Sequence, residues 1–281
     1  MKTDLLHQLK QVTSLSERQN IAREHIQFSM LEGLHLCGAF RQLAFVGGTC
    51  LRLIHGLARY SEDMDFSVSA QSSEKIDMVK IAKSLAAHLK TSGFDVEVAV
   101  KEKVSVMTVS VRIRGLFHEI GLSPLPDQKL LIKMEIDLRP PAGSKEERTI
   151  IQKPALASIN HYDLPSLMAG KLHALLARPY TKGRDWYDLL WYMNKSILPN
   201  VTLLQNALEQ RPSQYCQDAS QWAAGLNAKL RVIPWDSVRA DLAPFLQIPH
   251  ELEFIAPESF APLLVRLLAA SPTSMGIIKR V

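Results

Sequence analysis

The chain has 281 residues, of which 47% are hydrophobic and 22% are charged, so it is neither disordered nor fibrous. A net charge of +5 favours a polyanionic partner such as RNA or nucleotide phosphate without requiring one. The three cysteines form no CxxC motif, which argues against a disulfide scaffold and a zinc finger. No apolar run reaches the ~18–20 residues of a membrane helix, and the N-terminus lacks the apolar stretch of a signal peptide. We therefore expect a cytoplasmic protein of about two domains with no membrane partner.

The first part of the chain alternates predicted helices and strands. Ser14 and Glu17 have the spacing of a capping box, which predicts a helix over residues 16–35. The next predicted elements are a short buried strand over 43–46, a helical stretch after Thr49 and an amphipathic helix over 75–90.

Three later segments alternate apolar and polar residues with the period of two that is typical of strands. They cover residues 63–68, 105–114 and 130–139. One sheet with an apolar back and a charged front accounts for all three. The Pro-Pro pair at 140–141 ends the last strand, and a polar, charged loop is expected over 145–148.

The pattern becomes mainly helical after Asp163, which together with Pro165 predicts a helix start. The predicted helices cover residues 165–178, 184–194, 199–210, 218–229, 236–246 and 259–270. Strands and helices followed by helices alone predict an α+β (α/β-like) fold. We expect an N-terminal domain over 1–157, with a mixed β-sheet flanked by helices, and a C-terminal helical bundle over 158–281.

Gly47, Gly48 and Thr49 lie between a predicted strand and a predicted helix. Glycines at such a turn let the backbone approach phosphate oxygens, and the N–H groups at a helix start favour an anion. Thr49 adds a hydroxyl donor. The segment is neither a Walker loop nor a GxGxxG fingerprint, so it is a weak signal by itself.

Asp63 and Asp65 strengthen that signal. Two positions apart on a strand, they share a face with Cα atoms ~6–7 Å apart, and they repel each other unless a cation lies between them. Carboxylate oxygens suit Mg²⁺, and two such ions would stabilise the attacking and leaving oxygens of an in-line displacement at phosphorus. A third carboxylate is expected on a neighbouring strand, where Glu135 and Asp137 both lie on the polar face. The alternative interpretation is a solvated edge strand.

Two polar residues precede this acidic pair. Arg59 could bind a triphosphate or pair with Glu62, and the sequence favours neither. Ser61 stands at the start of the strand, where its hydroxyl could simply satisfy the turn.

Lys171 lies among apolar residues of a predicted helix, where a charged group needs a counter-charge or access to the surface. Asp185 and Asp188 lie one turn apart on the next helix, opposite an apolar stripe. Lys171 could bind nucleotide phosphate with Asp185 orienting it or assisting deprotonation of the acceptor hydroxyl. The alternative is a structural ion pair between two helices. A basic ledge is expected nearby from Arg178, Lys182 and Arg184.

Other residues are assigned to packing. His55 and His118 have no partner at ligand spacing, and Cys50 is interpreted as a small buried filler. Core positions are expected for the aromatic residues Trp186, Tyr187, Trp191 and Tyr192.

Several ordered motifs together resemble a known family. The segments FVGGT (45–49), RYSEDMDF (59–66) and IKMEID (132–137) resemble the polymerase-beta-like nucleotidyltransferases. With DLP (163–165), AGKLHAL (169–175) and KGRDWYD (182–188), the chain is similar to the AbiEii/AbiGii family of abortive-infection toxins.

The resemblance implies transfer of a nucleoside monophosphate from an NTP to an acceptor 3′-hydroxyl, with release of pyrophosphate. It further implies Mg²⁺ or Mn²⁺ as cofactor, the tRNA acceptor end or another RNA as acceptor, and a cognate antitoxin as partner. The catalytic residues it implies are Asp63, Asp65, Lys171 and Asp185. The metal ligands are Asp63 and Asp65 with Glu135, or with Asp137 in its place. The nucleotide-binding residues are Gly47, Gly48, Thr49, Arg59, Ser61 and Lys171.

Two other functions stay open at this stage. One is a nucleotidyltransferase that modifies a protein or a small molecule, and the other is a catalytically silent module that binds RNA or an antitoxin. The intact set of strand carboxylates disfavours the silent module, because a site without catalysis has no need for acids that repel each other.

Overall fold

The computed structural model describes residues 2–72, 76–152 and 155–269, which divide into two compact units. The first unit comprises Met1–Pro140 and Glu146–Tyr162, and the second comprises Pro141–Lys145 and Asp163–Val281. The sequence-based boundary after residue 157 lies five residues before the start of the second unit's main segment at Asp163. Among the described residues, every helix is too short or too polar to span a bilayer.

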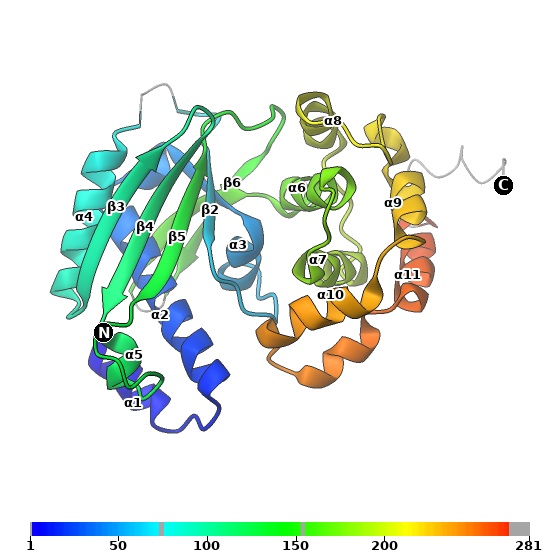
Figure 1. The fold of residues 1–281 in the computed structure, drawn as a ribbon. Coiled ribbons are helices and arrows are strands. Elements are labelled where there is room, and N and C mark those ends of the chain that lie inside the picture. Colours follow the sequence, from blue (N-terminus) through cyan, green and yellow to red (C-terminus); the bar gives the residue numbers. More distant parts are fainter. Residues whose placement is uncertain (1, 73–75, 153–154, 270–281) are drawn as a thin grey trace. The chain divides into compact units, whose positions relative to one another are not determined.

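A seven-stranded mixed sheet forms the centre of the first unit, with the strand order β3-β4-β5-β2-β1-β7-β6 (Figure 1). The strands are β1 (Leu43–Val46), β2 (Met64–Val68), β3 (Asp95–Glu102), β4 (Val106–Arg114), β5 (Leu130–Asp137), β6 (Glu146–Ile151) and β7 (Ala157–Tyr162). The β2–β5 and β1–β7 pairs are parallel and the others are antiparallel. Because β2 is the central strand, the interpretation of its acidic residues as a solvated edge is wrong.

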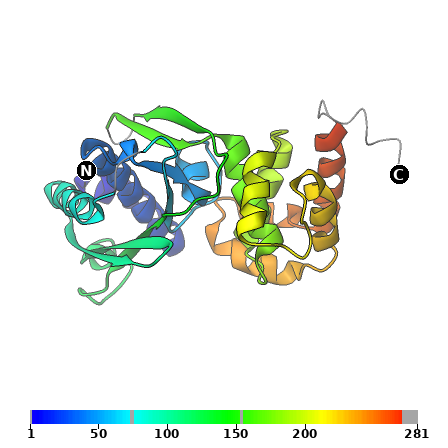
Figure 2. The ribbon, with the colours of Figure 1, turned by 90° about the horizontal axis from the view of Figure 1, so that it is seen from above.

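Helices cover one face of this sheet. α2 (Leu15–Leu36) and α4 (Met78–Thr91) pack against each other and against the sheet, on the same side of it (Figure 2). The predicted cap of α2 is confirmed, since the Ser14 hydroxyl accepts the N–H of Glu17. The buried residues of the alternating strands include Met64, Phe66, Val109, Val111, Ile132, Met134 and Ile136. Polar and charged residues occupy the positions between them, which confirms the predicted apolar back and charged front.

Three strands of the sheet, β3, β6 and β7, were not predicted, and β6 corrects the expectation of a loop over 145–148. In the described part of the chain β6 pairs with β7 alone, at the edge of the sheet, so half of its residues are exposed and most of them are polar. Its start is held by Glu146, whose carboxylate accepts the Ser69 hydroxyl at 2.7 Å and the Ala70 N–H at 2.8 Å.

The second unit is helical, as predicted. Its helices are α6 (Leu164–Ala177), α7 (Gly183–Asn194), α8 (Val201–Gln210), α9 (Trp222–Leu230), α10 (Trp235–Leu242) and α11 (Pro257–Ala269). The helix predicted over 236–246 ends at Leu242 and continues as a short 3₁₀ turn, because Pro244 has no N–H to extend the α-helical ladder. Residue 270 of the last predicted helix lies outside the described residues.

α7 is buried on nearly all sides. The Trp186 ring packs edge-on against Trp235 and Phe260, with centroid distances of 5.4 and 5.5 Å, as the core interpretation predicted. α7 begins at Gly183, where an added Cβ would lie 2.1 Å from the carbonyl oxygen of Val238 on α10. Only glycine permits this close approach of the two helices.

Candidate active site

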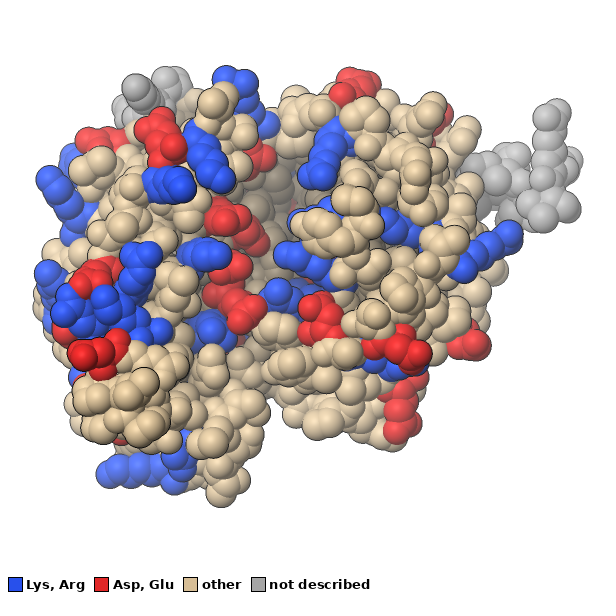
Figure 3. All heavy atoms as spheres, in the orientation of Figure 1, with Lys and Arg blue, Asp and Glu red and all other residues tan. Residues whose placement is uncertain are grey.

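Two acidic residues lie side by side on the central strands of the sheet. In the parallel β2–β5 pair, Asp65 is in register with Glu135, and Ser67 is in register with Asp137. Residues in register present their side chains on the same face of a sheet, about 5 Å apart. Asp63 lies two positions before Asp65 and therefore belongs to this face. Figure 3 shows acidic side chains in a row over the region of β5 and β2.

The turn after β1 packs directly on the carboxylate of Asp65. Gly47 has a φ of +78°, in the left-handed region that favours glycine. A Cβ at this position would lie 2.2 Å from Asp65 Oδ2. The backbone that begins α3 (Gly47–Leu53) therefore lies immediately beside the acidic pair, which is possible only because residue 47 has no side chain.

Thr49 connects this turn to the other aspartate. Its hydroxyl donates a short hydrogen bond to the main-chain oxygen of Asp63, and its side chain is fully buried. The sequence analysis predicted that this hydroxyl donates to a phosphate. In the structure it fixes the start of β2 to α3, so the backbone N–H groups of the turn are the better candidates for phosphate binding.

Arg59 lies beneath the turn. It is only 1% exposed, and its Nη1 donates to the carbonyl oxygen of Tyr60 at 2.9 Å. A Cβ on Gly48 would lie 2.6 Å from Arg59 Nη2 and 3.3 Å from Ser61 Oγ. Arg59 and Ser61 therefore lie against the turn, and the burial of Arg59 suits support of the turn better than direct contact with a triphosphate.

The segment before β2 is also held by a residue that the sequence analysis missed. Gln27 of α2 is buried, and its Nε2 donates to the carbonyl oxygens of Ser61 and Glu62 at 3.1 and 3.0 Å. A glutamine among the apolar positions of an amphipathic helix was the available signal. The Glu62 carboxylate lies 3.7 Å from the guanidinium of Arg23.

The two candidates for the third carboxylate differ in their surroundings. Glu135 is exposed and in register with Asp65. Asp137 accepts the backbone N–H of Arg139 at 2.9 Å, which stabilises the turn after β5. Burial raises the pKa of Asp137 above its ordinary value, and the hydrogen bond from Arg139 lowers it in part. These features favour Glu135 as the residue that works with Asp65.

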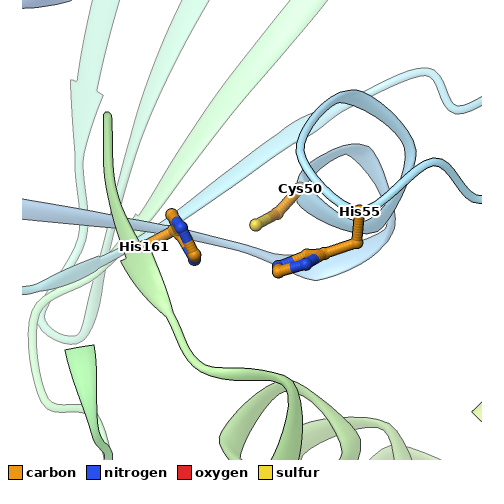
Figure 4. Close-up of side chains that lie close together, drawn as sticks. All are labelled: Cys50, His55 and His161. Atoms are coloured by element: carbon orange, nitrogen blue, oxygen red, sulfur yellow. The ribbon is translucent and has the colours of Figure 1, made fainter. Parts of the chain in front are cut away.

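Cys50, His55 and His161 meet in the first unit, although the sequence analysis found no partner for His55 and interpreted Cys50 as a small buried filler (Figure 4). Each contributes one possible ligand atom, and these atoms lie within 4.8 Å of one another. Burial raises the pKa of the Cys50 thiol well above its ordinary value, and the charge of Asp65 adds to this effect. His161 lies on β7, more than 100 residues further along the chain, so no local pattern could have revealed the group.

In the second unit, Lys171 of α6 is paired with two carboxylates of α7. Its Nζ lies 2.8 Å from both Asp185 Oδ1 and Asp188 Oδ2. Arg178 Nη1 lies 2.8 Å from Asp185 Oδ2. Both aspartates are buried, although the sequence placed them opposite the apolar stripe of the helix. The alternative of an ion pair between two helices thus describes the observed contacts, and a role in catalysis remains a prediction.

The predicted basic ledge is largely engaged in other contacts. Arg178 pairs with Asp185, and the Arg184 guanidinium lies 4.1 Å from the centroid of the Phe245 ring. Lys182 is the residue that precedes α7. The main-chain oxygen of Arg178 accepts a 3.0 Å hydrogen bond from Lys229 Nζ, and burial lowers the pKa of that lysine.

The mixed sheet with its acidic pair beside a Gly-Gly turn indicates the nucleotidyltransferase class. Residues 29–258 match the family model described as "Nucleotidyl transferase AbiEii toxin, Type IV TA system", and the chain belongs to this family. The resemblance stated from the sequence motifs is thereby confirmed. Toxins of this family act within toxin–antitoxin systems, as the family description states.

A solved structure agrees with this fold. A crystal structure from H. pylori, provisionally described as a nucleotidyltransferase, is 18% identical, with a TM-score of 0.56, over 93% of this chain and 97% of that chain. JHP933 from Helicobacter pylori is 19% identical, with a TM-score of 0.48, over 89% and 88% of the two chains. At 18% identity the first likeness concerns the fold alone. A search of curated proteins gives no match.

Proposed function

We propose that the protein is a metal-dependent toxin that transfers a nucleoside monophosphate from an NTP to the 3′-hydroxyl of an RNA, with the tRNA acceptor end as its target. Pyrophosphate is the second product. The observation that carries this proposal is the register of Asp65 with Glu135 on the two central strands, with Gly47 packed against the Asp65 carboxylate. Membership of the AbiEii family supports the reaction type and the toxin role.

The acidic group fits a hard divalent cation. Asp63, Asp65 and Glu135 supply carboxylate oxygens, the ligands that Mg²⁺ and Mn²⁺ prefer, and among the described residues neither Asp63 nor Glu135 has an ion-pair partner. When bound, such ions neutralise charge on the attacking and leaving oxygens at phosphorus. The carboxylates would hold these ions in place. The Thr49 hydroxyl fixes the main chain of Asp63, just before β2.

The turn and its support would hold the nucleotide. The backbone N–H groups of Gly47, Gly48 and Thr49 are the first of α3, and N–H groups at a helix start suit phosphate oxygens. Arg59 and Ser61 hold the turn in place from beneath. In the second unit, Lys171 binds nucleotide phosphate in this proposal. Asp185 orients it, because its two carboxylate oxygens already accept from Lys171 and Arg178.

The partners follow from the same assignment. An antitoxin is implied by the toxin–antitoxin family. The net charge of +5 suits an RNA acceptor, and we place the reaction in the cytoplasm, where NTP and tRNA occur together.

The decisive experiment supplies each radiolabelled NTP in turn to the full chain with total RNA, total protein or a metabolite extract. We expect label in the RNA fraction with Mg²⁺ and none with EDTA. Label confined to protein or to metabolites would mean that the acceptor is a protein or a small molecule and not RNA. No metal-dependent label in any fraction would favour a silent binding module.

Asp65→Asn is the matching variant, with Asp95→Asn on the exposed edge strand β3 as its control. Loss of a metal ligand removes several kcal/mol of charge stabilisation, so transfer should fall about 10³-fold in Asp65→Asn and stay unchanged in the control. Transfer by Asp65→Asn at the wild-type rate would show that the acidic site has been assigned wrongly.

A further inference from the structure

We propose that Cys50, His55 and His161 form a second, separate metal site that takes one Zn²⁺ ion and fastens α3 to β7. This site differs from the carboxylate site in its ligands and in the metal that it selects. It does not depend on the proposed reaction.

The three side chains come from different parts of the first unit and converge on one point (Figure 4). Cys50 lies in α3, His55 follows the end of that helix, and His161 lies on β7. Their candidate ligand atoms are within 4.8 Å of one another. Tetrahedral Zn²⁺ with Zn–S of about 2.3 Å and Zn–N of about 2.0–2.1 Å sets its ligand atoms roughly 3.3–3.6 Å apart. Binding would therefore close the widest separation by no more than about 1.5 Å.

The chemistry of the group selects zinc over magnesium. One thiolate and two imidazoles are borderline-soft ligands that suit Zn²⁺, whereas Mg²⁺ requires oxygen ligands. Three protein ligands leave a fourth position for water. Coordination replaces the thiol proton of Cys50 by the S–Zn bond, and that proton leaves to the buffer.

The hydrogen bonds of the His161 ring orient it for this role. Its Nδ1 lies 2.8 Å from the carbonyl oxygen of Tyr162, an acceptor that requires the proton on Nδ1. The lone pair then lies on Nε2, the nitrogen that faces a metal in sites of this kind. Thr149 Oγ1 lies 2.8 Å from Nε2 and would turn aside when the ion binds.

Simple packing is the competing explanation. The His55 and His161 rings are T-shaped, with centroids 5.1 Å apart and an interplanar angle of 83°, as aromatic pairs in a core often are. Packing alone, however, does not require a thiol and two imidazoles to meet at one point. A bound ion would fix α3, and with it the Gly47–Gly48 turn, to the sheet.

The test uses the full chain and two probe metals, Zn²⁺ and Co²⁺, each supplied in a separate dialysis. The protein is stripped with chelator, dialysed against each metal in the presence of excess Mg²⁺, and its metal content is measured. We expect one Zn²⁺ per chain. With Co²⁺ we expect the thiolate-to-metal charge-transfer band and the strong visible bands of tetrahedral coordination. Absence of stoichiometric uptake, or uptake without the thiolate band, would overturn the proposal.

Single variants identify the ligands. Cys50→Ala and His55→Gln should each weaken Zn²⁺ binding by at least about 100-fold, because even outer-sphere partners of a metal are worth 10–100-fold. His55→Gln is the safer variant, since His55 is only half-buried and its replacement leaves the core intact. Circular dichroism checks the fold of each. Either folded variant with wild-type affinity would overturn the assignment.

Matched controls separate this site from other parts of the chain. Cys216→Ala removes another buried cysteine, in the second unit, and His118→Gln removes the other histidine that the sequence analysis found without a partner at ligand spacing. Glu135→Gln removes an oxygen ligand of the carboxylate site. All three should keep one Zn²⁺ and the cobalt–thiolate band. Loss of the ion in Glu135→Gln would instead place it at the carboxylates.

Discussion

The two acidic clusters of this protein differ in where their counter-charge comes from. In the second unit, Asp185 and Asp188 are balanced within the protein by Lys171 and Arg178. In the sheet, Asp65 and Glu135 lie in register, with Asp63 two positions earlier. Acidic residues held this close repel each other, and a cation between them would lower that cost. The first cluster is thus balanced by cations of the protein, whereas the sheet cluster is the one that we propose to bind a metal ion.

The largest expected effect tests which carboxylate completes the sheet cluster. Glu135→Gln should reduce nucleotide transfer about 10³-fold, whereas Asp137→Asn, which alters a residue tied to the Arg139 N–H, should stay within about tenfold. Steady-state transfer at saturating NTP measures both. A larger loss in Asp137→Asn would assign the third ligand to Asp137.

The contact between Gly47 and Asp65 gives the next effect. In Gly47→Ala the new Cβ would enter the space of the Asp65 carboxylate, so transfer should fall about 100-fold. The left-handed backbone also costs an alanine about 1–2 kcal/mol of stability. Gly56→Ala is the matched control, because Gly56 has a φ of +74° and nothing within 4 Å of its Cβ position. Equal effects of the two variants on transfer would mean that contact with Asp65 is unimportant.

A stability effect is expected in the balanced cluster. Asp188→Asn removes the charge of a fully buried aspartate that pairs with Lys171, and it should lower the free energy of unfolding by about 2 kcal/mol, measured by urea denaturation. Asp236→Asn, in an exposed pair with Arg239, should change it by less than about 0.5 kcal/mol. Similar changes in the free energy of unfolding in both variants would show that burial of Asp188 does not increase its contribution to stability.

A double variant extends that comparison to function. Lys171→Met with Asp188→Leu replaces the pair by apolar side chains, which often restores stability. If Lys171 binds phosphate, stability should return while transfer stays lost. Recovery of both would leave Lys171 with a structural role only.

The smallest effect concerns pH. Burial lowers the pKa of His173 below its ordinary 6.5, an effect strengthened by Arg211 and Arg178, although the main-chain oxygen of Arg211 raises it in part. A lowered pKa means that the folded state binds fewer protons, so stability is fully present above pH 6.5 and is lost as the pH falls through the folded value. His173→Gln should therefore reduce the pH dependence of the free energy of unfolding in this acidic range, measured by urea denaturation at several pH values. An unchanged pH dependence would exclude His173 as a source of it.

Much of the fold was predictable because local patterns determine it. The alternation in β2, β4 and β5 and the capping residues Ser14 and Asp163 identified their elements closely. β6 escaped prediction because an edge strand needs no apolar face. β7 escaped because it is buried on both faces and does not alternate. β3 does alternate at Val96, Val98 and Val100, so its signal was present in the sequence.

The candidate site was predictable only in its residue types. Spacing indicated that Asp63 and Asp65 share a face, but strand order was needed to place Glu135 beside Asp65. The burial of Arg59, Asp185 and Asp188 depends on packing between elements, which a single sequence does not encode locally. The meeting of Cys50 with His161 depends on the long-range pairing of β1 with β7.

The hydrogen bond from Thr49 to the Asp63 main chain has a mechanical consequence. It joins the loop that would grip a triphosphate to the peptide that carries the first acidic side chain, so neither can shift alone. A displacement of a few tenths of an ångström at one would be transmitted to the other without any hinge. Anyone transplanting this loop into another scaffold must therefore transfer the strand with it.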